Sequence, residues 1–345
     1  MPLAFMRVVP PRLMICIHAR TMRLQLAALL LVVSSSMVAE PAASPLPLPA
    51  AGRRYDSILS FGDSFADTGN NLVVFATHSL ANPAAAPTYG ITFFGHPTGR
   101  NSNGRLVIDF IAEELGLPYV PPFLSDGGGG NFPSGVNFAV AGATALDAGF
   151  FGLIPGVVVS TSTAVQLQWF ESLKPSLCGH PSSDCEGFFH RSLFLMGEFG
   201  VNDYALSAVV KNLSQIRSFV PDVVRIISTA TERLIEQGAK TVVVPGIPPL
   251  GCSPPILAMS PSADPADYDP QTGCLKQLND LAMYHNSLLQ EAIEHVQTKH
   301  RPDASVIYAD FFTPVMDIVV SPQKFGFTRD ILKCCCGGGG EYNFN

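Results

Sequence analysis

Short apolar runs that alternate with longer stretches of helical periodicity constrain the fold of this chain more than any other feature. Five such runs, rich in apolar and β-branched residues, occupy residues 57–61, 135–141, 192–196, 241–244 and 305–309. Runs of this length are typical of strands that are buried on both faces of a parallel sheet. The chain is therefore predicted to form a mostly parallel sheet from these five strands.

Amphipathic helices are predicted between the strands. Apolar residues recur on one side of residues 106–115, 221–237 and 275–300, and Gly238 follows the second segment as a C-cap. Strands that alternate with helices imply a three-layer α/β/α domain with right-handed crossovers. Since no internal repeat or second domain is visible, residues 44–345 are expected to form one domain.

Composition limits the partners of the protein. The net charge is −7, charged residues make up 14% of the chain, and no basic run occurs. Nucleic acid and anionic membrane surfaces are therefore poor candidates as partners. The glycine runs at 127–130 and 337–340 neither follow a predicted strand nor open a helix, so they are not phosphate-binding loops.

The N-terminal segment has the pattern of a signal peptide. Two arginines precede an apolar stretch at 24–33, which small residues follow. We therefore expect residues 1–43 to be removed and the protein to be secreted, with Asn212 of a glycosylation sequon as a candidate glycan site. A signal anchor is the alternative, but the uncharged stretch is just short of a membrane span. Initiation at Met22 would give a more ordinary signal peptide.

The eight cysteines fit an oxidising compartment. Cys178 and Cys185 bracket a short loop, and Cys252 and Cys274 bracket a proline-rich one. Both pairs are plausible disulfides, although spacing does not determine connectivity. Spacing assigns no pairing to the cluster at 334–336, and a zinc site is not expected there because no second ligand pair accompanies it.

Polar residues follow three of the predicted strands at the point where each strand ends. Ser64 comes after the first strand within Gly-Asp-Ser, Gly142 after the second and Asn202 after the third. In an open parallel sheet, ligands bind beyond the carboxyl ends of the strands. The three residues are therefore expected to share one site.

This set of residues suits chemistry on an acyl group. A serine hydroxyl attacks an acyl carbon once its proton is removed, and the resulting oxyanion needs hydrogen-bond donors about 3 Å away. The candidate donors are the backbone N–H groups of Ser64 and Gly142 and the side-chain amide of Asn202. Glycine lets a substrate approach the backbone closely, and asparagine donates without carrying charge.

Recognisable motifs are spread over nearly all of residues 55–345. They are FGDSFADTGNN at 61–71, HPTGRNSNGR at 96–105, GVNFAVAGA at 135–143, GEFGVNDY at 197–204, PGIPPLG at 245–251 and CCGGGG at 335–340. With these motifs the chain resembles the GDSL esterase/lipases of plants, within the SGNH hydrolase superfamily. No Gly-x-Ser-x-Gly elbow occurs, which argues against an ordinary α/β-hydrolase.

The resemblance implies both a fold and a function. The fold is a flavodoxin-like α/β/α domain, in agreement with the alternation of strands and helices. The function is that of a carboxylic-ester hydrolase in which Ser64 is the nucleophile and Gly142 and Asn202 complete the oxyanion hole. The substrates are acetyl and other acyl esters of small metabolites, lipids or wall sugars. No cofactor or metal ion is implied, and we expect a monomer.

The catalytic base is the main departure from the resembled family, which supplies it from a C-terminal Asp-x-x-His motif. None of the eight histidines has an aspartate three residues before it. Residues 44–345 are therefore expected to form a domain that is truncated at its C-terminus and impaired in hydrolysis. His285, His295 and His300 lie on the last predicted helix, where a solvated or side-packed histidine is the usual case. His96 lies in a loop that could border the site.

Two other functions stay open. A non-catalytic protein could keep the cleft to hold an ester or a sugar, and an acyltransferase could pass the acyl group to an alcohol instead of water. Aromatic side chains are candidates either for an acyl pocket or for core and loop anchors, namely Phe93, Phe94, Phe150 and Phe151.

Overall fold

The computed structural model describes residues 54–152, 161–178, 184–327 and 331–344, so the expected signal peptide at 1–43 lies outside the described residues. Within these ranges the chain folds around a five-stranded sheet in the order β2-β1-β3-β4-β5, and every pairing is parallel. The strands are β1 (Ser57–Ser60), β2 (Gly135–Asn137), β3 (Ser192–Leu195), β4 (Thr241–Pro245) and β5 (Ser305–Ala309). The predicted parallel sheet is confirmed, and its strand order is the flavodoxin-like one.

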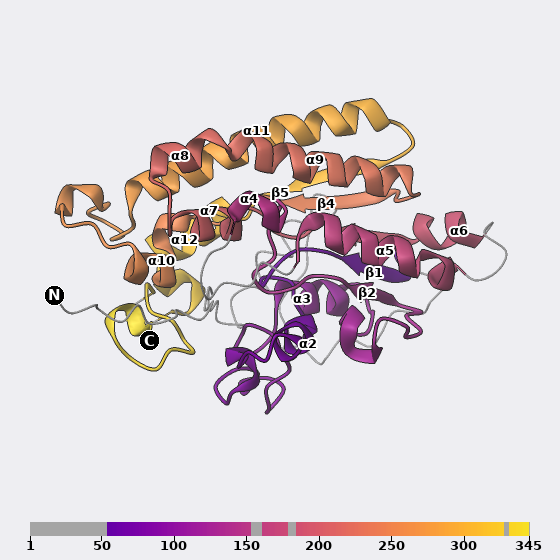
Figure 1. The fold of residues 1–345 in the computed structure, drawn as a ribbon, viewed down its shortest axis with the longest axis horizontal. Helices are drawn as coiled ribbons and strands as arrows, with labels where there is room; N and C mark the ends of the chain where they lie inside the picture. The colour runs from indigo at the N-terminus through magenta and orange to yellow at the C-terminus, as the bar shows by residue number, and fades with distance from the viewer. Residues whose placement is uncertain (1–53, 153–160, 179–183, 328–330, 345) are drawn as a thin grey trace, which may run out of the picture.

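Helices connect the strands (Figure 1). They are α2 (Asn70–Thr77), α3 (Val107–Glu114), α4 (Ala148–Phe151), α5 (Thr163–Cys178), α6 (Asp184–His190), α7 (Val201–Ser207), α8 (Leu213–Ser218), α9 (Val220–Glu236), α10 (Pro254–Met259), α11 (Lys276–His300) and α12 (Phe312–Val320). Short 3-10 turns are η2 (Pro83–Ala85), η3 (Phe123–Asp126), η4 (Leu250–Cys252), η5 (Pro265–Asp267), η6 (Pro322–Phe325) and η7 (Glu341–Asn343). Helices α3, α9 and α11 confirm the three that the sequence predicts. Gly238 follows α9 with φ of +114°, a conformation that favours glycine.

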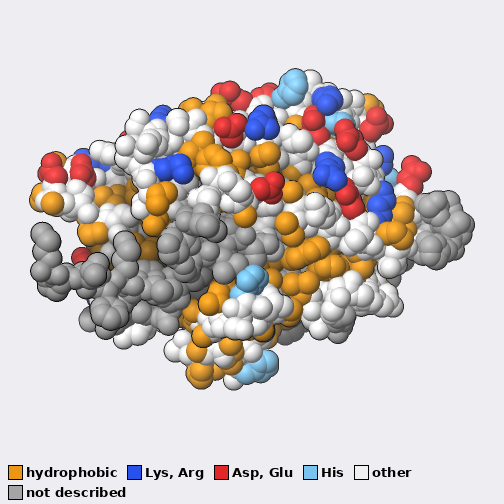
Figure 2. Space-filling model, in the orientation of Figure 1, with side chains coloured by type: hydrophobic (Ala, Val, Ile, Leu, Met, Phe, Trp, Pro, Cys, Tyr) orange, Lys and Arg blue, Asp and Glu red, His pale blue; other side chains and the backbone are white. Residues whose placement is uncertain are grey.

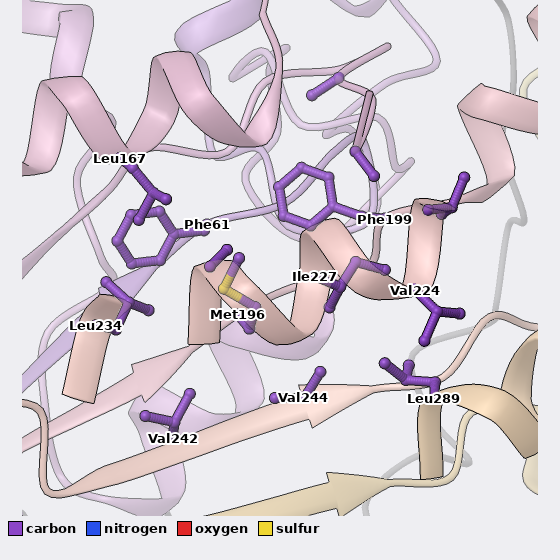
Figure 3. Packing of buried hydrophobic residues seen from close by; sticks show 14 of the residues in the cluster. Phe61, Leu167, Met196, Phe199, Val224, Ile227, Leu234, Val242, Val244 and Leu289 are labelled. Atoms are coloured by element: carbon purple, nitrogen blue, oxygen red, sulfur yellow. The ribbon is translucent and has the colours of Figure 1, made fainter. Parts of the chain in front are cut away.

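Side chains of the strands alternate between the two faces of the sheet. Leu59 and Val242 belong to a large core with residues of α5, α9 and α11, whereas Ile58 and Leu193 pack with residues of α3. Figure 3 shows side chains of α9 packed over β4 in the larger core. Figure 1 shows α9 and α11 side by side on the same side of the sheet. The three-layer α/β/α architecture is therefore confirmed.

Strand β2 is shorter than predicted, because it ends at Asn137 rather than near residue 141. Past Asn137 the N–H groups of Phe138 and Val140 still donate to the carbonyl oxygens of Ser60 and Gly62, and side chains bond the backbone groups of the alternate residues. The Asn70 amide donates to the carbonyl oxygens of Asn137 (2.7 Å) and Ala139 (2.9 Å), and the Asn137 side chain accepts from the Ala139 N–H. Since β2 is an edge strand of the sheet, its free side is open to such side-chain bonds.

Disulfides within the described residues fasten segments outside the sheet. They join Cys178 to Cys185 and Cys252 to Cys274, so both pairings that the sequence makes plausible are confirmed.

Along residues 54–152, 161–178, 184–327 and 331–344, no helix combines the length and the apolar character that a membrane crossing requires.

Candidate active site

The carboxyl ends of the three neighbouring strands β2, β1 and β3 carry the predicted site residues. Ser64 follows β1, the central strand of the three, and is only 7% exposed. Gly62 just before it has φ of +125°, and a Cβ there would lie 3.0 Å from the Cα of Gly197 after β3. The two chain segments therefore approach each other closely, which only glycine allows. Gln166 of α5 fixes this turn, because its side chain bonds both the N–H (2.9 Å) and the carbonyl (2.7 Å) of Gly62.

The structure brings the three predicted residues together. Ser64, Gly142 and Asn202 line one small cleft. Gly142 has φ of +85°, and the position of a Cβ there would meet nothing within 4 Å, so its backbone faces open space. Asn202 lies in the first turn of α7, where its amide nitrogen Nδ2 donates to the Asp63 carboxylate (2.8 Å) and to the Ala143 carbonyl (3.0 Å).

Asp63 and Glu198 form a buried carboxyl pair next to the nucleophile. Both side chains are almost free of solvent contact, and Glu198 accepts a hydrogen bond from the Val201 N–H at 3.1 Å. Burial raises the pKa of Asp63 to about 6. Burial, followed by the charge of Asp63, raises the pKa of Glu198 well above its usual value. Glu198 is therefore harder to ionise than an ordinary glutamate, while the Asp63 carboxylate accepts hydrogen bonds from Asn202 and from the backbone N–H of Phe65 (2.9 Å).

Two further buried aspartates tie the loops of the cleft to one another. Asp67 accepts a hydrogen bond from the backbone N–H of Ala141 at 2.7 Å and so joins the loop after β1 to the loop after β2. Asp203 accepts from the N–H groups of Ala145 and Leu146, both at 2.9 Å, and so joins the start of α7 to the loop after β2. Burial raises the pKa of each aspartate to about 7.

Sequence reasoning does not assign these supporting side chains a role. Asp63, Asp67, Glu198 and Asp203 all stand inside the motifs that identify the site, within a few residues of Ser64 or Asn202. Their position in the sequence beside Ser64 and Asn202 could therefore have been used to predict that they support the site. Gln166 lies outside every motif, and nothing in the sequence distinguishes it.

None of the histidines in residues 54–152, 161–178, 184–327 and 331–344 lines the cleft. His285 is buried on α11 with its Nδ1 2.7 Å from the Tyr204 hydroxyl, and burial lowers its pKa to about 3. The ring is therefore neutral near pH 7. His295 is exposed and His300 half-buried, so the expectation of solvated or side-packed histidines on this helix is confirmed. His96 is exposed and hydrogen-bonds the neighbouring Pro97 carbonyl.

Aromatic side chains other than the four considered from the sequence reach the cleft. Phe75 of α2 lines it together with Pro83, while Phe93, Phe94, Phe150 and Phe151 do not. Phe93 and Phe94 instead pack against Tyr119, at ring distances of 6.2 and 6.0 Å. Phe150 packs against Phe219 at 5.0 Å. These contacts favour the interpretation of the four side chains as anchors of loops and core.

Metal ligands are not assembled in the described residues, where no group of three or more His, Cys, Asp or Glu side chains is placed to hold an ion. The cleft lining likewise contains neutral residues only, as far as the structure describes it. The arrangement offers a hydroxyl, backbone N–H groups and an amide, which are groups that suit acyl chemistry.

Comparison with known proteins adds an independent line of support. The family model of GDSL-like lipases/acylhydrolases matches residues 58–340. The chain is 46% identical to GDSL esterase/lipase At1g31550 of Arabidopsis thaliana, over 85% of this chain and 74% of that protein. It is also 46% identical to a sinapine esterase of Brassica napus, over 85% of this chain and 75% of that protein. A third relative, GDSL esterase/lipase At1g28600 of Arabidopsis thaliana, is 43% identical over 93% of this chain and 80% of its own length.

Proposed function

Because the chain belongs to the GDSL-like lipase/acylhydrolase family of serine esterases and lipases, we propose that it acts on carboxylic esters with Ser64 as the acyl nucleophile. The observation that carries the proposal is the convergence of Ser64, Gly142 and Asn202 on one cleft at the carboxyl ends of adjacent parallel strands. Ligands bind at this edge in open α/β sheets. The ester carbonyl would lie between the serine hydroxyl and the candidate donors.

The proposed oxyanion hole consists of the backbone N–H groups of Ser64 and Gly142 and the Asn202 amide. Both hydrogens of the Asn202 amide are already donated, one to Asp63 and one to the Ala143 carbonyl. A negatively charged oxyanion is a stronger acceptor than a neutral carbonyl oxygen. We therefore expect Asn202 to exchange its bond to Ala143 for one to the oxyanion, while Asp63 continues to hold the amide in place.

The catalytic base is the missing part of the proposal. No histidine of the 345 residues stands in an Asp-x-x-His motif, and none lines the cleft in the described part of the chain. Loss of the base from a serine site typically lowers turnover on the order of 10⁶-fold, although the oxyanion hole still contributes. The 345-residue chain is therefore proposed to turn over esters weakly. The same observation favours a second candidate function, which is the holding of an ester without hydrolysis.

The proposal also covers the location of the protein, its glycosylation and its substrates. The signal-peptide pattern supports secretion, and the exposed position of Asn212 at the start of α8 supports glycosylation there. Acetyl and other acyl esters of small metabolites, lipids or wall sugars are the proposed substrates, with no cofactor and a monomeric enzyme.

Slow covalent labelling tests the proposal. The folded chain and a Ser64→Ala variant are incubated for hours with an activated aryl phosphonate, and the labelled peptides are identified by mass spectrometry. We expect one adduct, on Ser64, because the cleft offers both a nucleophile and donors for the phosphoryl oxygen. Equal labelling of both proteins would contradict the assignment of Ser64. A complete lack of labelling would favour the ester-holding function.

A further inference from the structure

Asparagine side chains in the cleft beside Ser64 carry polar atoms that have no hydrogen-bond partner in the described part of the chain. Asn71, Asn82 and Asn101 line the cleft together with Ser64. Both polar atoms of the Asn71 side chain and the amide nitrogens of Asn82 and Asn101 are buried without a partner in the described part of the chain. Leaving a buried amide group unpaired costs about 1–3 kcal/mol. Several such atoms on one wall therefore indicate groups that a ligand supplies.

The surroundings determine the orientation of the Asn82 amide but not that of the Asn71 amide. Asn82 accepts a hydrogen bond from the Ala84 N–H at 2.9 Å through its side-chain oxygen, so its amide nitrogen is the unpartnered atom. Asn71 is 1% exposed, and its backbone N–H is held by the Asp67 carboxylate at 3.1 Å. Because both side-chain atoms of Asn71 are unpartnered, it offers donors and an acceptor whichever way the amide is turned.

The cleft selects against charge. Its described lining contains no ionisable side chain, and Phe75 and Pro83 add an apolar surface. On the face shown in Figure 2, Lys, Arg, Asp and Glu side chains gather over α9 and α11, and few lie around α2. A charged ligand would lose its hydration here without gaining an opposite charge. The ligand is therefore neutral, with both polar and apolar surface.

We propose that Asn71, Asn82 and Asn101 form a subsite for the hydroxyl-rich part of a neutral ester, such as an acetylated sugar. Hydroxyl groups both donate and accept, so they pair with the amide nitrogens and with the Asn71 oxygen at once. A ligand with carbonyl groups alone would leave that oxygen unpaired. The assignment rests on the proposed function, because the ester group has to reach Ser64 from this subsite.

Binding to a Ser64→Ala variant tests the subsite without relying on turnover. The probes are methyl 6-O-acetyl-glucopyranoside and cyclohexylmethyl acetate, which has a similar ring without hydroxyl groups, and affinities come from ligand-observed NMR titration. We expect the sugar ester to bind more tightly than the cyclohexyl ester. In this background, Asn71→Ala and Asn101→Ala are each expected to weaken binding of the sugar ester by about 2- to 12-fold, the range of one hydrogen bond, and to leave the cyclohexyl ester unchanged.

Matched control variants separate the loss of a hydrogen bond in the cleft from a general effect of substitution. Asn82→Asp retains the oxygen that accepts from Ala84 but removes the donor, so it too should weaken sugar binding. Asn131→Ala removes an exposed loop asparagine that does not line the cleft and should change nothing. If Asn71→Ala does not fold, as judged by circular dichroism, Asn101→Ala and Asn82→Asp carry the test.

The outcomes separate the subsite from the proposed function. Equal affinity for the two esters, with no effect of the asparagine substitutions, would overturn the subsite and leave Ser64 as the candidate nucleophile. Tighter binding of acetylcholine than of the sugar ester would also overturn it, because a cation finds no opposite charge in the described lining. If the folded Ser64→Ala chain binds neither ester, the cleft is not an ester site and the proposed function fails as well.

Discussion

Individual polar residues organise the site around Ser64 from positions that are almost free of solvent contact. Asp63, Asp67 and Asp203 are fully buried, and each accepts hydrogen bonds that place a loop or an amide of the cleft. Burial disfavours their charged forms, whereas the N–H donors around them favour charge, which explains why their pKa values are raised only to about 6 or 7. The positions of Gly142 and Asn202 therefore depend on groups that are not among the described lining residues of the cleft.

His285 gives a pH-dependent prediction at the scale of one residue. Its pKa is lowered to about 3 by burial, against 6.5 for an ordinary histidine. Between these values the unfolded chain binds a proton that the folded chain does not bind. The neutral ring therefore contributes stability that is complete above pH 6.5 and is lost as the pH falls toward 3.

A His285→Gln variant, which can still hydrogen-bond Tyr204, isolates this contribution. We expect the free energy of unfolding of the wild type to fall more steeply with acidification than that of the variant, by up to about 1.4 kcal/mol per pH unit. Urea unfolding between pH 3.5 and 7 measures the difference. If the gap between the two proteins stays constant over this range, His285 titrates alike in the folded and unfolded chains, contrary to the prediction.

Helix α3 depends on a buried ion pair that joins it to the loop at 96–105. The Arg100 guanidinium donates to both carboxylate oxygens of Asp109, at 2.9 and 2.8 Å, and it also bonds the Thr68 carbonyl. Asp109 in turn accepts from the Leu106 N–H at the start of the helix. One pair of side chains therefore connects the helix, this loop and the segment that follows Ser64.

The double-mutant cycle of Arg100→Met and Asp109→Asn tests this connection. Arg100→Met should lower the free energy of unfolding by about 3–5 kcal/mol, because it leaves a buried carboxylate unpaired. The double variant should lose clearly less than the sum of the single losses, since the amide that replaces the carboxylate carries no charge. Arg225→Met, which breaks the exposed pair with Asp222, serves as the control and should change stability by no more than about 1 kcal/mol. Additive losses in the cycle would contradict the prediction.

Elements differ in how far the sequence predicts them. The strands and the helices α3, α9 and α11 are predicted because their apolar periodicity extends over enough residues to be read. Helix α5 (Thr163–Cys178) is missed, although Leu167, Phe170 and Leu173 stand three residues apart on its buried face. Its interior Pro175 and the buried polar Gln166 obscure that pattern. Strand β2 ends earlier than predicted, and the side chain of Asn70, distant in sequence, bonds the carbonyl oxygens of Asn137 and Ala139 there.

The residues of the candidate site also fall into some that the sequence predicts and some that it does not. Ser64, Gly142 and Asn202 are predicted because they follow strands that are recognisable in the sequence. The hydrogen bonds of Asn202 to Asp63 and the unpartnered amides of Asn71 and Asn101 could not be predicted, since they depend on which loops of the folded chain meet. Polar residue types in a motif therefore indicate a site, but their division into positioning and binding roles requires the fold.

The whole molecule combines a well-packed α/β/α scaffold with a cleft at one edge of its sheet. Large buried side chains from both neighbouring layers, such as Phe61, Met196 and Ile227, hold the sheet and helices together (Figure 3). Buried hydrogen bonds join the loops that follow β1, β2 and β3 to one another. Such connections suit the preorganised oxyanion hole that we propose for Ser64, Gly142 and Asn202.

Hydrolysis of p-nitrophenyl acetate with and without added imidazole tests the central claim most directly. The rate of the Ser64→Ala variant is subtracted at each imidazole concentration, which removes the catalysis by imidazole itself. We predict little Ser64-dependent turnover in the absence of imidazole, and a Ser64-dependent rate that rises with its concentration, because a small external base replaces the missing one. Vigorous Ser64-dependent turnover without imidazole would contradict the missing base. Identical rates for the wild type and the variant at every concentration would contradict the role of Ser64 as nucleophile.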